Sequence, residues 1–392
     1  LWDLNGGKCL AVLEGHTDKI RGVHLLEGNR ALSWSWDGTL RLWDLNGGKC
    51  LAVLEGHTDM IRGVHLLEGD RALSWSWDYT LRLWDLSDGK CLTVLKGYTH
   101  EIEGIHLLEG DRVLSWSGDT LRIWDLKSGA SLAVLEGHTD KIRGIHLLEG
   151  DRALSWSGDG TLRLWDLSHR DECIEVIEGH TDRIEGVHLL EGDRALSWSG
   201  GDRTLRLWDL SGGDCLAVLE GHMRSVGGVH LLEGDRALSW DFDLRLWDLN
   251  GGKCLAVLEG HTGGVVGVHL LEGDRALSWS GGGTLHLWDL SDGKCLAVLE
   301  GHADRIDGAH LLEDDRALSW SWDGTLRLWD LNGGKCLAVL EGHTDRIEGV
   351  HLLEGDRALS WSLDHSLRLW DLSDGKCLAV LEGQTMRIAG VH

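Results

Sequence analysis

The sequence contains no proline, and only one phenylalanine and two tyrosines accompany its 22 tryptophans. Without proline, no turn is preset by a pyrrolidine ring, so glycine, asparagine, aspartate and serine have to form the turns. Tryptophan is large, and its indole N–H needs a partner when it is buried. So many tryptophans therefore require a large core, exposed binding positions, or both.

Basic residues are also few, with 38 against 64 acidic residues and a net charge of -26. This excess of carboxylates repels a phosphate backbone, so we expect no nucleic-acid partner and favour a protein or peptide. No apolar run approaches the roughly 20 residues that span a bilayer, and no signal peptide is visible. The sequence therefore predicts no membrane partner.

The nine cysteines form no C-x-x-C pair, so a structural zinc site is not indicated. They recur about once per repeat, too far apart to pair, and free thiols in this number favour a reducing, cytoplasmic location. The chain begins with LWDL, without methionine, and ends with AGVH. We expect it to be a fragment of a longer protein.

An internal repeat dominates the chain, because a WD dipeptide preceded by Leu or Ile recurs ten times, from Trp2 to Trp370, at steps of 39 to 43 residues. Each unit contains four alternating segments, such as KIRGVHLL, ALSWS, TLRLWDL and CLAVLE, separated by turns such as EGNR, WDG and NGGK. Alternation and turn residues of this kind predict β-strands, and no sustained helical period is present. One four-stranded sheet cannot bury both faces, whereas sheets stacked radially around a channel can.

The sequence thus predicts an all-β propeller of four-stranded antiparallel blades. Nine complete repeats occupy residues 15–382, with a partial repeat at 1–14 and the start of a further repeat at 383–392. Nine blades in one ring is the main interpretation. A seven- or eight-bladed ring with leftover repeats is the alternative, since propellers usually have four to eight blades.

The order GH, Ser, Asp and WD in each unit resembles the WD40 repeat family along essentially the whole chain. In that family a His, a Ser, an Asp and the Trp of WD form a hydrogen-bonded tetrad that ties the sheet, so the resemblance implies five complete tetrads here. They are His16, Ser33, Asp37 and Trp43; His57, Ser74, Asp78 and Trp84; His138, Ser155, Asp159 and Trp165; His302, Ser319, Asp323 and Trp329; and His343, Ser360, Asp364 and Trp370.

A Ser-His-Asp set invites interpretation as a hydrolase, but a nucleophile has to lie where substrate reaches it. Here the set recurs in sheet after sheet and ends on an indole, so we interpret it as structural and expect no enzyme activity. Four repeats depart from the pattern and should be less well tied. The third has Tyr98 in place of His, the fifth has an extra Gly, the sixth lacks two residues, and the seventh has Gly282 in place of Asp.

Two further positions recur in nearly every repeat. Trp34 and its equivalents alternate with the tetrad Ser, which predicts packing between sheets. His24 and its equivalents, in GVH, form a second histidine series. That series is able to bind metal or sense pH, but alternation directs it at the next sheet, so we expect no metal and no cofactor.

The near-identical repeats differ mainly at three positions. These are the residue before the Ile or Val that begins the first strand, the residue after it, and the turn residue that precedes the tetrad Asp. All three should lie on the same mouth of the propeller. These differences are either drift at exposed positions or a binding site. If nine blades close into a ring, the ninth meets the first, and four apolar turn residues with a basic rim form one arc. The expected partner-binding residues are Trp36, Trp77, Trp322, Leu363, Lys19, Arg21, Arg62, Arg305 and Arg346.

The leading functional hypothesis is a non-catalytic scaffold or sensing module that binds a protein or peptide on one mouth of the propeller. The expected partner contributes an acidic or amphipathic segment. Near-identical arrays of this kind resemble the sensor ends of NACHT-type signalling ATPases, which implies a signalling role. A metal- or pH-responsive protein that uses the second histidine series is one alternative. A structural or designed repeat array is another.

Overall fold

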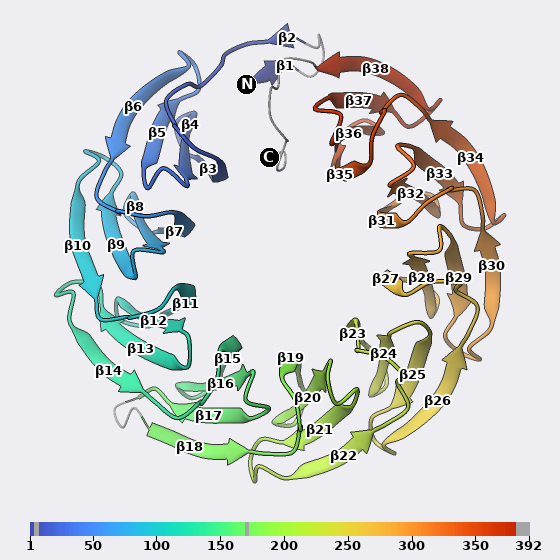
Figure 1. Cartoon of the computed structure of the whole chain (residues 1–392), viewed down its shortest axis with the longest axis horizontal. Coiled ribbons are helices and arrows are strands. Elements are labelled where there is room, and N and C mark those ends of the chain that lie inside the picture. Colours follow the sequence, from blue (N-terminus) through green and yellow to red (C-terminus); the bar gives the residue numbers. More distant parts are fainter. Residues whose placement is uncertain (4–7, 169–171, 382–392) are drawn as a thin grey trace. The chain divides into compact units, whose positions relative to one another are not determined.

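The computed structural model describes residues 1–3, 8–168 and 172–381, and every regular element in this part of the chain is a β-strand (Figure 1). The strands form nine four-stranded sheets and one two-stranded sheet. Each four-stranded sheet is one complete repeat, so the fold is an all-β propeller, as predicted. The segment 383–392 lies outside the described residues. Within those residues, no helix is long and apolar enough to cross a membrane.

The described residues fall into two compact units, the first containing 1–3 and 9–186. The two-stranded sheet pairs β1 (Trp2–Asp3) with β2 (Lys8–Cys9), at the beginning of the chain. Four complete sheets follow in the first unit. They are β3 (Ile20–Leu26), β4 (Arg30–Ser35), β5 (Leu40–Asp44) and β6 (Lys49–Leu54); β7 (Ile61–Leu67), β8 (Arg71–Ser76), β9 (Thr80–Asp85) and β10 (Cys91–Lys96); β11 (Ile102–Leu108), β12 (Arg112–Ser117), β13 (Thr120–Asp125) and β14 (Ser131–Leu135); and β15 (Ile142–Leu148), β16 (Arg152–Ser157), β17 (Leu162–Asp166) and β18 (Glu172–Ile177).

The second unit contains Lys8 and the described residues from Val187 on, and five sheets lie wholly or mostly within it. They are β19 (Ile184–Leu190), β20 (Arg194–Ser199), β21 (Leu205–Asp209) and β22 (Cys215–Leu219); β23 (Gly228–Leu232), β24 (Arg236–Trp240), β25 (Leu244–Asp248) and β26 (Lys253–Leu258); β27 (Val265–Leu271), β28 (Arg275–Ser280), β29 (Leu285–Asp289) and β30 (Cys295–Leu299); β31 (Ile306–Leu312), β32 (Arg316–Ser321), β33 (Leu326–Asp330) and β34 (Lys335–Leu340); and β35 (Ile347–Leu353), β36 (Arg357–Ser362), β37 (Leu367–Asp371) and β38 (Lys376–Leu381).

Register within a sheet follows from the turns and is the same from repeat to repeat. In the second sheet, β7 and β8 pair Leu67 with Arg71 across a turn in which Gly69 and Asp70 have φ values of 73° and 54°. Glycine and aspartate tolerate this left-handed backbone better than most residues. The EGDR turns therefore supply the reversal that proline would otherwise help to set.

Packing between sheets uses the Trp34 series, as the sequence predicts. Trp34 belongs to a buried cluster that joins Leu32 and Leu40 of the first sheet to Ile61 and Val64 of the second. Trp34 also lies opposite Gly22 on the neighbouring strand, and a Cβ on Gly22 would lie only 2.2 Å from Cζ2 of the indole. The glycine of each GVH segment therefore makes room for a tryptophan of the same sheet.

Candidate functional site

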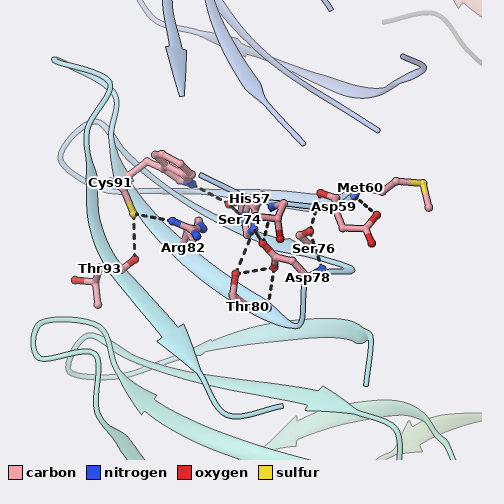
Figure 2. A network of polar contacts seen from close by, with 12 residues as sticks. His57, Asp59, Met60, Ser74, Ser76, Asp78, Thr80, Arg82, Cys91 and Thr93 are labelled. Carbon is pink, nitrogen blue, oxygen red and sulfur yellow. Dashed lines mark hydrogen bonds and ion pairs between the residues drawn. The ribbon is translucent and has the colours of Figure 1, made fainter. Parts of the chain in front are cut away.

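In the second sheet, the four expected tetrad residues contact one another (Figure 2). His57 Nε2 lies 2.7 Å from Ser74 Oγ, and His57 Nδ1 lies 2.8 Å from Asp78 Oδ2. The Trp84 indole donates to Ser74 Oγ at 2.8 Å. Because a carboxylate only accepts, Nδ1 carries the imidazole proton and Ser74 donates its hydroxyl proton to Nε2. Each buried polar side chain of the tetrad therefore has a partner.

The structure brings the other four tetrads together in the same way. His Nδ1 lies 2.8 to 2.9 Å from the Asp carboxylate in each of them, and the Trp indole donates to Ser Oγ at 2.8 Å. The His–Asp pairs are His16–Asp37, His138–Asp159, His302–Asp323 and His343–Asp364.

Four donors surround each tetrad carboxylate. Asp37 accepts from His16 Nδ1, from the backbone N–H groups of Thr17 and Thr39, and from Thr39 Oγ1, at 2.7 to 2.9 Å. Burial acts to raise the pKa of Asp37, but the hydrogen bonds from Thr39 and Thr17 outweigh it and hold the pKa at about 2. The carboxylate is therefore fully ionised at neutral pH.

Burial lowers the pKa of His16, His57, His138 and His343 despite the neighbouring carboxylates, so these imidazoles are neutral at pH 7. The serine hydroxyl is also inaccessible, since Ser74 has no exposed surface. A buried serine that is already engaged by an indole and an imidazole is poorly placed to attack a substrate.

The irregular repeats differ in how far the tetrad is lost. In the third repeat, Tyr98 replaces His, and its hydroxyl lies 2.8 Å from Ser115 Oγ. In the sixth repeat we expected a weakened tetrad, but Asp241 supplies its carboxylate. Asp241 accepts from the N–H groups of Met223 and Arg224 and lies 3.1 Å from His222 Nδ1. The sequence signal was the first Asp of DFD. Only the seventh repeat, with Gly282, has no carboxylate at this position among the described tetrads.

Two of the variable positions, the turn residue and the residue before the first-strand Ile, lie side by side because a backbone hydrogen bond joins them in several repeats. The N–H of the turn residue donates to the carbonyl before the first-strand Ile, as in Trp36 to Lys19 at 2.9 Å and Trp322 to Arg305 at 3.0 Å. Leu363 makes the same bond to Arg346 at 3.1 Å, and its side chain is half-buried. The structure thus places the backbone of these three turn residues next to that of their expected basic neighbours.

Trp322, in the second unit, has more polar and charged neighbours than the other turn tryptophans. Its side chain is 39% exposed, and its ring lies between the guanidinium groups of Arg305 and Arg346, at 5.4 and 5.0 Å from the ring centroid. The indole N–H donates to Asp307 Oδ2 at 2.6 Å, and Asp307 also accepts from Arg305 Nε at 2.9 Å. The ring is therefore fixed in place while one part of its surface stays open.

Two similar pairs occur in the first unit. Lys19 Nζ lies 4.7 Å from the centroid of Trp36, and the guanidinium of Arg62 lies 5.8 Å from that of Trp77. Both rings are half-buried, while Arg21 is exposed. The residues of the single arc expected from ring closure thus belong to two units.

One aromatic–cation pair was missed in the sequence. The exposed ring of Phe242 in the sixth turn lies 5.1 Å from the guanidinium of Arg224. The signal was available, since Phe242 occupies an altered turn and Arg224 lies in the loop that follows GH. The register of the shortened sixth repeat hid their pairing.

Six members of the second histidine series, including His24 and His106, contact a backbone carbonyl of the next sheet. His24 Nε2 lies 3.1 Å from the Val64 carbonyl, and four equivalents in the second unit make the same contact at 2.8 to 2.9 Å. Such a nitrogen has to donate to the carbonyl, so it is not free to hold a metal ion. No group of metal-binding residues is found within the described ranges.

Comparison with protein families gives matches to the description "WD domain, G-beta repeat" in six segments, at 7–44, 48–85, 129–166, 171–209, 293–330 and 334–371. The chain belongs to the WD40 family. The stretches without a match contain most of the third repeat, the whole sixth repeat and most of the seventh, where the tetrad sequence departs from the pattern. These WD40 repeats diverge at residues that form the tetrad.

The WD40 chain was also compared with curated proteins and with solved structures. No curated protein matches it. Among solved structures it resembles the "computationally designed Ika8 protein", with 24% identity and a TM-score of 0.52. The match covers 82% of this chain and 99% of that one. At this level of identity, the likeness concerns the fold alone.

Proposed function

We propose that this WD40 chain is a non-catalytic interaction module whose turn face binds a protein or peptide. WD40 repeats in general support protein interaction. The observation that carries the proposal is Trp322, an exposed indole between two guanidinium groups and fixed by Asp307. Tryptophan and arginine dominate the binding energy of many interfaces because they offer a large rigid surface and several donors.

The chemistry of the site favours an amphipathic segment with an acidic residue. An apolar side chain of the partner packs on the exposed part of the Trp322 ring, and a carboxylate accepts from guanidinium N–H groups of Arg305 or Arg346. Asp307 and Glu348 lie close to these arginines and reduce their net charge. The apolar contact should therefore contribute more than the charge does. Trp36 and Trp77 provide the same chemistry in the first unit.

The other hypotheses have less support. Metal binding by the second histidine series, or its use as a pH sensor, would compete with the hydrogen bonds that imidazoles such as His24 and His269 already make to the next sheet. A purely structural or designed array predicts that no partner uses the turn tryptophans at all. That difference makes the binding experiment decisive between them.

The test is selection of peptides from a displayed library on the immobilised chain, followed by affinity measurements with variants. Trp322→Ala should weaken the selected peptide by at least about 30-fold, or roughly 2 kcal/mol, with little change in melting temperature. Trp36→Ala and Trp77→Ala should weaken peptides that bind the first unit.

The matched control is Leu337→Ala, which removes another exposed apolar side chain from the same repeat. Leu337 lies on β34, away from the turn, and its loss should leave the affinity unchanged. If all three tryptophan variants bind as tightly as the parent, the turn residues have only drifted and the proposal is wrong.

A further inference from the structure

The seventh repeat keeps most of a tetrad but lacks its carboxylate. His261 Nε2 lies 2.6 Å from Ser278 Oγ, and the Trp288 indole donates to that oxygen at 2.8 Å. The residue at the aspartate position is Gly282, whose N–H still donates to Ser280 Oγ at 3.2 Å, as Asp37 N does to Ser35 Oγ at 3.0 Å in the first repeat. The turn backbone is therefore conserved while its side chain is absent.

The donors that surround a carboxylate in other repeats are still present here. In the fourth repeat, Asp159 accepts from His138 Nδ1, Thr139 N, Thr161 N and Thr161 Oγ1, at 2.7 to 2.9 Å. The equivalent groups in the seventh repeat are His261 Nδ1, Thr262 N, Thr284 N and Thr284 Oγ1. Thr284 Oγ1 lies 3.5 Å from His261 Nδ1, compared with 3.2 Å between the equivalent atoms of Thr161 and His138 in the fourth repeat.

We propose that this vacancy is a binding site for a carboxylate supplied from outside the chain. The ligand is either a small free carboxylate or the carboxyl group of a protein partner. It accepts the four hydrogen bonds that an aspartate accepts in the intact tetrads. The proposal does not depend on Trp322, which lies in another repeat.

Access to the site is open on the turn side. Gly281 and Gly282 are exposed, so no side chain of the turn covers the vacancy. The Thr262 side chain reaches into it, since a Cβ on Gly282 would lie 2.2 Å from Thr262 Oγ1 and 3.2 Å from the backbone nitrogen of Gly263. Rotation about the Thr262 Cα–Cβ bond moves this hydroxyl away. The eighth repeat has Ala303 at this position, and its backbone N–H still donates to Asp323 at 2.9 Å.

The imidazole also favours an anion at this place. Burial lowers the pKa of His261 to about 3, with the neighbouring His286 adding to the effect. At neutral pH the ring is uncharged and its Nδ1–H is available to donate. A bound carboxylate next to the ring favours the imidazolium and so raises the pKa of His261. That shift distinguishes occupation of this site from general effects of salt.

The experiment measures the melting temperature in sodium formate against sodium chloride at equal ionic strength. Formate should raise the melting temperature of the parent in proportion to the logarithm of its concentration above the dissociation constant. Gly282→Asp supplies the carboxylate within the chain, so it should raise the melting temperature in chloride and abolish the response to formate. Thr262→Ala should bind formate more tightly than the parent, because the vacancy is already open.

The matched control is Asp159→Gly, which turns SGDGT at 157–161 into SGGGT, the sequence at 280–284. This variant should lose stability and gain a second response to formate. A ¹H–¹⁵N histidine spectrum, assigned with His261→Gln, should show the His261 pKa rising with formate in the parent but not in Gly282→Asp. A glutamate-containing peptide and its glutamine twin distinguish a protein carboxyl from a free one, since only a protein-derived ligand favours the peptide over formate.

Two results would overturn the proposal. One is a parent that responds to formate no more than Gly282→Asp does. The other is a combination of two observations: the melting temperature of the Asp159→Gly variant gains no response to formate, and the pKa of His261 in the parent stays unchanged when formate is added. Neither result depends on whether the Trp322 surface binds a peptide.

Discussion

At the scale of single residues, the repeat depends on pairs that fit only together. Gly144 lies opposite Trp156, and a Cβ on the glycine would lie 2.2 Å from the indole Cζ2. The His146 ring contacts the same indole at a tilt of 41°, with 5.0 Å between centroids. Indole, glycine and imidazole thus form one packed set, and no member can change size alone.

Gly144→Ala should therefore lower the free energy of unfolding by about 1–3 kcal/mol, because the added methyl group displaces a buried indole. Chemical denaturation measures this loss. In a Trp156→Leu background, the same substitution should cost much less, since the smaller side chain leaves room for the methyl group. Equal costs in the two backgrounds would show that the strain arises from the backbone and not from the indole.

At the scale of the sheet, the tetrad makes stability depend on pH. A histidine whose pKa is lowered in the folded state stays neutral while its unfolded counterpart, with a pKa near 6.5, takes up a proton. Stability is then complete above the unfolded pKa and falls as the pH drops toward the folded pKa. The carboxylates act at lower pH, since their stabilisation is present above about pH 3.9 and is lost as the pH falls further.

His261 provides the sharpest case, because its folded pKa is about 3 and no carboxylate opposes the shift. Between pH 6.5 and 5, the proton that the unfolded chain takes up at this histidine should lower the free energy of unfolding of the parent by about 2 kcal/mol, at roughly 1.4 kcal/mol per pH unit. Urea denaturation at pH 7 and 5, in a buffer without carboxylates, should show a smaller loss for His261→Gln than for the parent. Leu337→Ala, which removes an exposed side chain without a titratable group, is the control and should lose as much as the parent.

At the scale of the whole molecule, neighbouring repeats are joined by arginine–aspartate pairs and carry a large negative charge. Arg30 contacts Asp70 at 3.0 Å, Arg236 contacts Asp274 at 2.9 Å, and Arg316 contacts Asp356 at 3.1 Å, each across two sheets of one unit. These pairs are partly exposed, so each contributes at most about 1 kcal/mol. The net charge of -26 acts in the opposite direction through self-repulsion.

Sodium chloride should therefore raise the melting temperature between about 0.05 and 0.5 M, because screening relieves repulsion over the whole surface. Differential scanning calorimetry measures the shift. Arg316→Gln should lose little stability in low salt and keep the same upward response. A melting temperature that falls with salt would mean that the pairs between sheets outweigh the repulsion of the excess carboxylates.

The sequence by itself determined the sheet, its strands and its tetrads, because strict repetition made the pattern of each unit visible in its neighbours. His57, Ser74, Asp78 and Trp84 lie where their spacing places them, since short antiparallel strands with tight turns leave little freedom of register. Only the tertiary structure showed that Asp241 restores a tie in the shortened repeat, that Phe242 meets Arg224, and that Asp307 fixes Trp322 while reducing the charge of Arg305. These contacts depend on how irregular loops close and on which side-chain conformers fit, and a repeat pattern carries no information about either. The closed ring of nine blades stays a prediction, because joining the ends of a propeller depends on small rotations between sheets that are summed over the whole chain.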